Sequence, residues 1–215
     1  MLKAGTKETD LTVERKWIDG TTNMFTRYFG CQVSELALTA EFGGIVTADF
    51  TVLGRGRATP SNNAIAGATY ADASTAPKFA GPDVKNIAIG GLGEVDYSTL
   101  NLTVTQDRAT QGKLGSAFAR GIGTAGKTIE LVALLYRKDF GPENLIQNGI
   151  ENPAVSISFD VEFNGAGYRF IIPAAQPSFP EDSEDGANQM VSVTFSPLGD
   201  AVSGTDIMIQ KLPVA

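Results

Sequence analysis

Apolar and polar residues alternate with a period of two along much of the chain. In residues 33–41, Leu36, Leu38 and Ala40 fall on one face, whereas Glu35, Thr39 and Glu41 fall on the other. This alternation is typical of a half-buried β-strand. The same pattern predicts further long strands at residues 45–54, 99–108 and 128–137, and shorter ones at 155–161, 168–172 and 191–195.

Turn and helix signals separate these strands. The pairs Gly43-Gly44 and Asn164-Gly165 predict tight hairpin turns, because both tolerate a positive φ. Residues 139–149 have an early proline, an acidic first turn and a terminal glycine, which together predict one short helix. Residues 55–82 are rich in small residues and predict a long surface connection. We therefore expect an all-β fold, a β-sandwich or partial barrel with one short α-helix, forming a single domain over residues 1–215.

Composition excludes several classes of function. The 17 basic and 24 acidic residues give a net charge of -7, which disfavours attraction to nucleic acid or to an anionic membrane. The absence of histidine removes the common nucleophile systems, and the single cysteine, Cys31, predicts no disulfide. The sequence indicates no enzyme, no cofactor and no metal. Because the first residues lack a secretion signal, we expect the chain to stay in the cytoplasm or to leave by another route.

One segment matches a nucleotide-binding motif. Residues 121–128, GIGTAGKT, satisfy the pattern G-x-x-x-x-G-K-[ST] and suggest a P-loop NTPase. A phosphate loop needs a buried strand before it and a helix after it. Residues 114–120 are too small and polar for such a strand, and residues 129–136 favour a strand over a helix. A glycine-rich connection between strands is the preferred interpretation.

The carboxylates of the predicted strands form the main candidate site. Glu35, Glu41, Asp49 and Glu130 lie on polar strand faces among small residues, and no aromatic residue is interleaved to desolvate a catalytic pair. Lys and Arg are missing from these faces until Arg55, Arg108 and Arg137 at the predicted strand ends. Such a surface would suit the wall of a conduit through which DNA slides without sticking. An ordinary exposed sheet face kept soluble by acidic groups is an equally good interpretation.

Two other clusters carry alternative interpretations. Trp17 and the group Phe25, Tyr28 and Phe29 suit packing or a subunit contact better than a ligand-stacking surface. Residues 181–185, EDSED, predict a solvated loop between two strands, since they lack the spacing of a calcium-binding loop.

Three segments resemble a known family. Residues 11–15 (LTVER), 28–38 (YFGCQVSELAL) and 43–54 (GGIVTADFTVLG) resemble the tail tube proteins of long-tailed bacteriophages with non-contractile tails. The similarity continues through residues 100–104, the strand ending at Asp139 and the helix near Leu145. The resemblance implies a virion structural protein, assembled in the bacterial cytoplasm, whose six-membered rings stack into a tube. Each subunit would contribute four long strands to an inner barrel with an acidic lumen, which conducts DNA during ejection.

The resemblance also implies partners and leaves alternatives. The expected partners are further copies of the chain, a tape measure protein, tail-tip or terminator proteins, and DNA in transit, with no membrane. Members of the family carry more chain before the first matching strand, which predicts a truncated or a short member here. The alternatives are an Hcp-like secretion-tube ring and a monomeric β-sandwich that binds carbohydrate.

Overall fold

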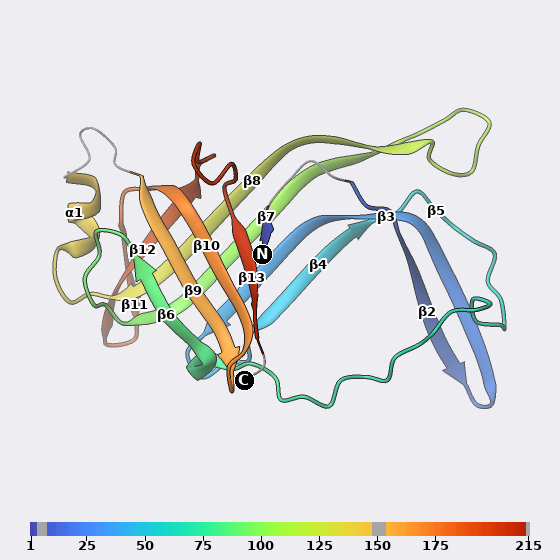
Figure 1. Ribbon diagram of the computed structural model, residues 1–215, viewed down its shortest axis with the longest axis horizontal. Helices are drawn as coiled ribbons and strands as arrows, with labels where there is room; N and C mark the ends of the chain where they lie inside the picture. The colour runs from blue at the N-terminus through green and yellow to red at the C-terminus, as the bar shows by residue number, and fades with distance from the viewer. Residues whose placement is uncertain (4–7, 148–153, 214–215) are drawn as a thin grey trace.

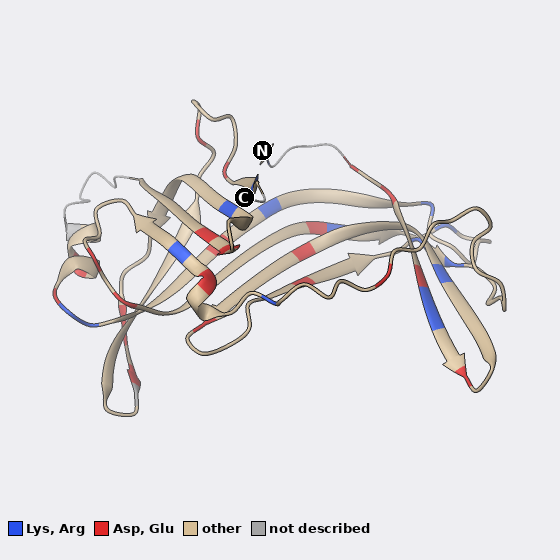
Figure 2. Cartoon of the chain, turned by 60° about the horizontal axis from the view of Figure 1, so that its bottom comes forward, with Lys and Arg blue, Asp and Glu red and all other residues tan. Residues whose placement is uncertain are grey.

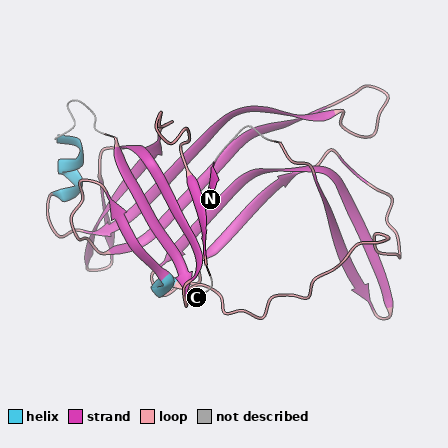
Figure 3. Cartoon of the chain, viewed as in Figure 1, coloured by secondary structure: helices cyan, strands magenta, loops and turns pink. Residues whose placement is uncertain are grey.

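The chain folds almost entirely into β-strands, as the computed structural model shows (Figures 1 and 3). The structure describes residues 1–3, 8–147 and 154–213. The strands are β1 (Leu2–Lys3), β2 (Leu11–Asp19), β3 (Thr22–Glu41), β4 (Thr47–Leu53), β5 (Gly56–Arg57), β6 (Val84–Ile89), β7 (Tyr97–Gln111), β8 (Gly121–Tyr136), β9 (Val155–Phe163), β10 (Ala166–Pro177), β11 (Glu181–Asp185), β12 (Asn188–Pro197) and β13 (Met208–Leu212). One short α-helix, α1 (Gly141–Gln147), and a 3-10 turn at Gly81–Asp83 complete the described elements. The expected all-β class is confirmed.

Two antiparallel layers form the body of the molecule. The first, which we call the long sheet, has the order β4-β3-β7-β8-β12, with β11 paired to the far side of β12. The second, the short sheet, has the order β6-β9-β10-β13-β1. The end of β10 also pairs with the end of β12, so the layers join at one side. The result is a partly open sandwich (Figure 1).

The core lies where the two layers overlap. Leu102, Leu131 and Ala133 of the long sheet are fully buried against Phe159 and Ile172 of the short sheet. The Phe159 and Phe170 rings stack with centroids 4.9 Å apart. This packing explains the alternation in the sequence, since β3, β7, β8 and β12 turn their buried apolar residues toward the short sheet. Helix α1 closes one end of the core with Leu145.

Beyond the overlap, the long strands continue away from the sandwich and β3 pairs with β2 to form a projecting ribbon (Figure 1). We call this ribbon the arm: β2 together with residues 22–29 of β3. A bulge separates the arm from the body, because Leu11 pairs with Cys31 whereas Val13 pairs with Tyr28. Gly30, inside this bulge, has a φ of 56°, a conformation that favours glycine. The bulge therefore lets one continuous strand serve both regions.

Both predicted turns are confirmed by backbone geometry. Gly43 has a φ of 73° between β3 and β4, and Asn164 and Gly165 have φ values of 51° and 77° between β9 and β10. The predicted helix is confirmed over Gly141–Gln147, while its last two expected residues lie outside the described part of the chain. The predicted connection at 55–82 contains β5 and the 3-10 turn, and is otherwise irregular.

Candidate functional site

The long sheet brings the four candidate carboxylates to one face. Asp49 on β4 and Glu130 on β8 belong to the same cross-strand row, separated by Ala37 and Thr103. Glu35 lies in the next row, between Thr51 and Thr105. Glu41 lies two rows further along β3 from Asp49 and on the same side, since side chains alternate along a strand. Residues from four strands thus share one surface, which we call the acidic face.

The acidic face carries charge of a single sign. Between the carboxylates its rows hold mainly hydroxyl and small side chains, namely Thr47, Thr51, Ala37, Thr39, Thr99, Asn101, Thr103, Thr105, Thr128, Ser192 and Thr194. The Thr105 hydroxyl lies 3.5 Å from a carboxylate oxygen of Glu35. No lysine or arginine lies in these rows, and Figure 2 shows the acidic positions along the middle of the long strands. Phosphate groups would find no cation on this surface.

The single lysine within the paired stretch points elsewhere. Lys127 lies three residues before Glu130, so the alternation of side chains places it on the opposite side of β8, where its Nζ lies 2.7 Å from a carboxylate oxygen of Asp206. Arg108 and Arg137 lie toward the two ends of the strands, in contacts described below. The polar strand faces that lack lysine and arginine in the sequence therefore lie side by side in the structure and form the continuous acidic face.

The opposite face of the long sheet is only partly covered. Under the short sheet it forms the core, but over β4 it leaves Phe50 61% and Val52 41% exposed. Strand β4 pairs only with β3, and residues 121–130 of β8 pair only with β7 among the described strands. The long sheet thus has two open edges, and β4 presents an uncovered apolar strip beside one of them. Open edges and apolar strips of this kind are features of surfaces that bind further chains.

The segment that matches a P-loop is part of strand β8. Gly121 pairs with Gln111 and Thr124 with Arg108, so the glycine-rich residues extend the β7–β8 hairpin. A phosphate loop would be followed by a helix. Here the strand continues without a break as far as Tyr136. The expectation of a connection at 121–128 was wrong in detail, because strand pairing overrides the turn preference of glycine; the connection lies at residues 112–120.

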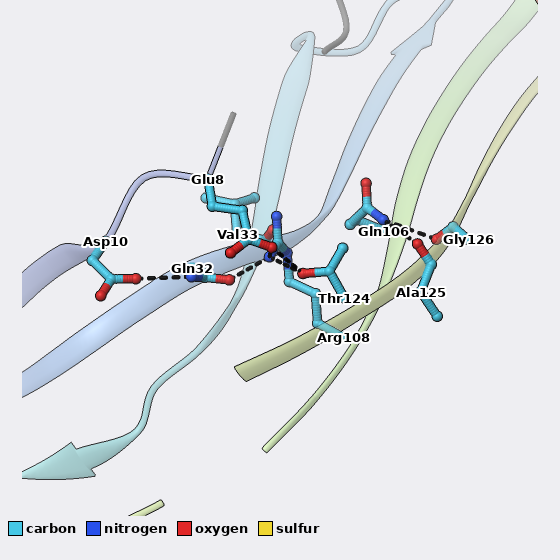
Figure 4. Close-up of polar contacts among 9 residues, drawn as sticks. All are labelled: Glu8, Asp10, Gln32, Val33, Gln106, Arg108, Thr124, Ala125 and Gly126. Atoms are coloured by element: carbon cyan, nitrogen blue, oxygen red, sulfur yellow. Dashed lines mark hydrogen bonds and ion pairs between the residues drawn. The ribbon is translucent and has the colours of Figure 1, made fainter. Parts of the chain in front are cut away.

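A polar cluster joins the chain before β2 to the long strands (Figure 4). Arg108 of β7 donates a 3.0 Å hydrogen bond to a backbone carbonyl of β3, a 2.8 Å bond to Thr124 of β8, and a further bond to Gln32 of β3. Thr124 in turn donates to Glu8, 2.5 Å away, and Gln32 donates to Asp10. These contacts fix the root of the arm on the long sheet. Sequence analysis missed the cluster because its members lie up to 116 positions apart.

The aromatic candidates divide between packing and exposure. Phe25 is 8% exposed, and Phe29 meets Phe118 edge to face, with ring centroids 5.3 Å apart. A Cβ at Gly56 would lie 2.4 Å from the Phe118 ring, so glycine leaves room for this pair. Tyr28 is 37% exposed.

The acidic segment 181–185 is a strand and not the predicted loop. It forms β11, which pairs along its whole length with β12 and turns at Gly186, where φ is 60°. Arg137 at the end of β8 forms ion pairs with Asp182 and, at 2.7 Å, with Glu143 of α1. The prediction failed because the sequence alone gives no sign of the backbone pairing that a neighbouring strand offers. Charged side chains also suit an edge strand, where they oppose unwanted pairing.

Within the described ranges, no group of three or more His, Cys, Asp or Glu side chains is arranged to hold a metal ion. None of the helices described is long and apolar enough to cross a membrane.

The features above are those of an all-β chain with two open sheet edges. A family model described as phage tail tube protein matches residues 2–205 of the chain. The chain therefore belongs to the phage tail tube protein family, and it is a structural subunit of a virion tail that assembles into a tube. A comparison with individual curated proteins found no match.

Proposed function

We propose that this chain forms six-membered rings that stack around a DNA-conducting lumen, and that the acidic face lines this lumen. The observation that carries the proposal is that Glu35, Glu41, Asp49 and Glu130 share one face with no cation among them. DNA adheres to proteins mainly where lysine and arginine displace the counterions of its phosphates. A wall of carboxylates and hydroxyls repels the phosphates instead and allows the duplex to slide.

The two open edges of the long sheet support a closed ring. Neighbouring strands alternate in direction from β4 through β3 and β7 to β8, so β4 and β8 run in opposite directions. The free edge of β4 in one copy can therefore continue, antiparallel, onto the free edge of β8 in the next. Closure would remove both unprotected edges and cover Phe50.

The remaining parts of the proposal follow from the family. The whole of residues 1–215 acts as one structural domain without catalysis or a bound cofactor. The partners are further copies of the chain, a tape measure protein that fills the lumen before DNA, and tail-tip or terminator proteins. Assembly takes place in the host cytoplasm. An Hcp-like secretion ring is the second candidate, and the edge geometry would serve it equally well.

Electron microscopy of the purified protein across a concentration series, with light scattering for mass, tests the ring. We expect six-membered rings or hollow tubes. A protein that stays monomeric and binds a sugar or a nucleotide would contradict the proposal.

A charge reversal tests the lumen assignment. In the variant Asp49→Lys with Glu130→Lys, tubes should still form but should retain added duplex DNA, and this retention should fall steeply with salt. The matched control, Asp72→Lys with Glu94→Lys, changes the same net charge at exposed positions off the acidic face. Equal DNA retention by the two variants, or an outer-wall position for residue 130 in reconstructed tubes, would refute the lumen assignment.

A further inference from the structure

Strand β4 carries two large apolar side chains on the side away from the acidic face. Asp49 and Thr51 lie on the acidic face, so the alternation along the strand turns Phe50 and Val52 to the opposite side. Phe50 is 61% exposed and Val52 41%. Pairing between the backbone edges of two copies would leave most of this apolar surface in water. A second contact, made by side chains, is needed to cover it.

The loop between β12 and β13, residues 198–206, holds an apolar side chain out to solvent. We call it the outer loop. Val202 is 96% exposed in it. The loop is nevertheless tied by hydrogen bonds: the backbone N–H of Ser203 donates a 2.6 Å bond to the carboxylate of Asp200, and Nζ of Lys3 donates a 2.6 Å bond to the carbonyl of Ser203. A loop ordered in advance loses little conformational entropy when it binds, so its exposed valine suits a contact with another chain.

An ion pair holds the outer loop on β8. Nζ of Lys127 lies 2.7 Å from a carboxylate oxygen of Asp206, on the side of β8 away from the acidic face. Figure 1 shows the loop, in red, beside β8. Phe50 of β4 is on the same side of the long sheet, but β3 and β7 lie between β4 and β8. Three strand spacings make this separation about 14 Å. The outer loop and the apolar strip of β4 are therefore apart within one copy.

The proposed ring closure brings the two features together. Strand β12 leaves the edge of β8 unpaired at residues 121–130, and it runs antiparallel to β8, as the β4 of a neighbouring copy would. The incoming β4 would thus continue the line of β12, with Thr47 opposite Glu130. This register aligns the acidic faces of the two copies and places Phe50 opposite Lys127. The outer loop leaves the end of β12 at this same junction.

We infer that the outer loop of each copy covers Phe50 and Val52 of the next copy around the ring. The inference rests on the proposed function, because it presupposes closure between β4 and β8. Val202 packs on the Phe50 ring, and the methylene groups of Lys127 contact the same ring while its ammonium stays paired with Asp206. The lysine of the segment that matches a phosphate loop thus serves assembly.

A charge placed on the outer loop tests the contact. Val202→Asp should raise the concentration needed for ring formation about tenfold or more, because it would bury a carboxylate against Phe50. Phe140→Asp is the matched control and should leave that concentration unchanged, because Phe140 is 72% exposed but precedes α1, beyond the other end of β8. Light scattering across a dilution series measures both, and thermal unfolding checks that each variant is folded. Equal responses of the two variants would overturn the inference.

A double-substitution cycle identifies the residue that Val202 meets. Phe50→Ala and Val202→Ala should each raise the ring-forming concentration about fivefold to tenfold. Together they should raise it by clearly less than the product, because either change already removes the contact. In the control cycle, Phe50→Ala with Phe140→Ala, the two effects should multiply. Multiplying effects at residues 50 and 202 would overturn the inference and leave the ring proposal standing. A parent protein that forms no ring at any concentration would overturn both.

Discussion

The long strands run through the sandwich and continue into the part of the molecule beyond the overlap of the two layers, which we call the projecting half. The two parts differ in how their apolar residues are covered. In the sandwich, both layers cover each other, and Leu102, Leu131 and Ile172 are fully buried. In the projecting half, the strands keep their alternation, yet Phe50 and Trp17 stay exposed. The two layers of the sandwich bury a shared apolar core, whereas the apolar side of β4 in the projecting half has no second layer over it. Under the proposed ring, this difference separates residues that stabilise the fold from residues that other copies would cover.

The largest expected effect compares one phenylalanine from each half. Phe159→Ala removes a fully buried ring and should lower the free energy of unfolding by about 3–5 kcal/mol. Phe50→Ala should change it by less than about 1 kcal/mol, because the ring is 61% exposed, but it should weaken ring formation. Urea unfolding followed by circular dichroism, together with sizing, measures both quantities. Similar losses of stability in the two variants would remove the distinction between the halves.

The next effect concerns a buried carboxylate in the sandwich. Asp160 is 1% exposed and accepts hydrogen bonds of 2.6 and 2.7 Å from Arg169 and one of 2.8 Å from Asn86. The bonds from Arg169 lower the pKa of Asp160 below its ordinary value of 3.8. The stability it contributes is thus fully present above that value and is lost as the pH falls through the lower folded pKa.

Replacing this carboxylate tests its contribution. Asp160→Asn should cost about 2–3 kcal/mol at neutral pH, since it leaves the guanidinium of Arg169 without its anion. The variant should also lose part of the decline in melting temperature below about pH 4. An unchanged acid profile would show that other carboxylates govern it.

A smaller effect is expected where the two halves meet. Gly30→Ala strains a positive φ and brings a Cβ to 2.0 Å from Nε of Arg55, so it should cost about 2 kcal/mol and displace the arm. Gly20→Ala is the control, because Gly20 has a φ of 57° but open space around it, and should cost about 1 kcal/mol. Hydrogen exchange along β2 reports the arm directly. Equal effects of the two substitutions would mean that Arg55 moves aside freely.

Much of the fold could be predicted because strand alternation is a local signal. The period of two in residues 33–41 and the turn residues Gly43 and Asn164 identified strands and hairpins that the structure contains. Glycine and acidic segments misled the prediction at 121–128 and 181–185, where pairing with a neighbouring strand outweighs the local preference. The arm was not predicted, because the alternation indicated a strand only at residues 33–41. The structure shows one strand that runs from Thr22 to Glu41 through the bulge at Gly30.

The candidate site shows the same division. Alternation alone assigned Glu35, Asp49 and Glu130 to polar faces, because the side-chain period of a strand is fixed by covalent geometry. That these faces form one surface follows from the register of β4, β3, β7 and β8, which the sequence does not show. The polar cluster around Arg108 likewise depends on contacts between residues far apart in the chain. Which residues lie on the same side of a strand is a local property of the sequence. Which strands lie side by side, which edges stay open and which apolar residues stay bare depend on long-range pairing, and the tertiary structure alone determines them.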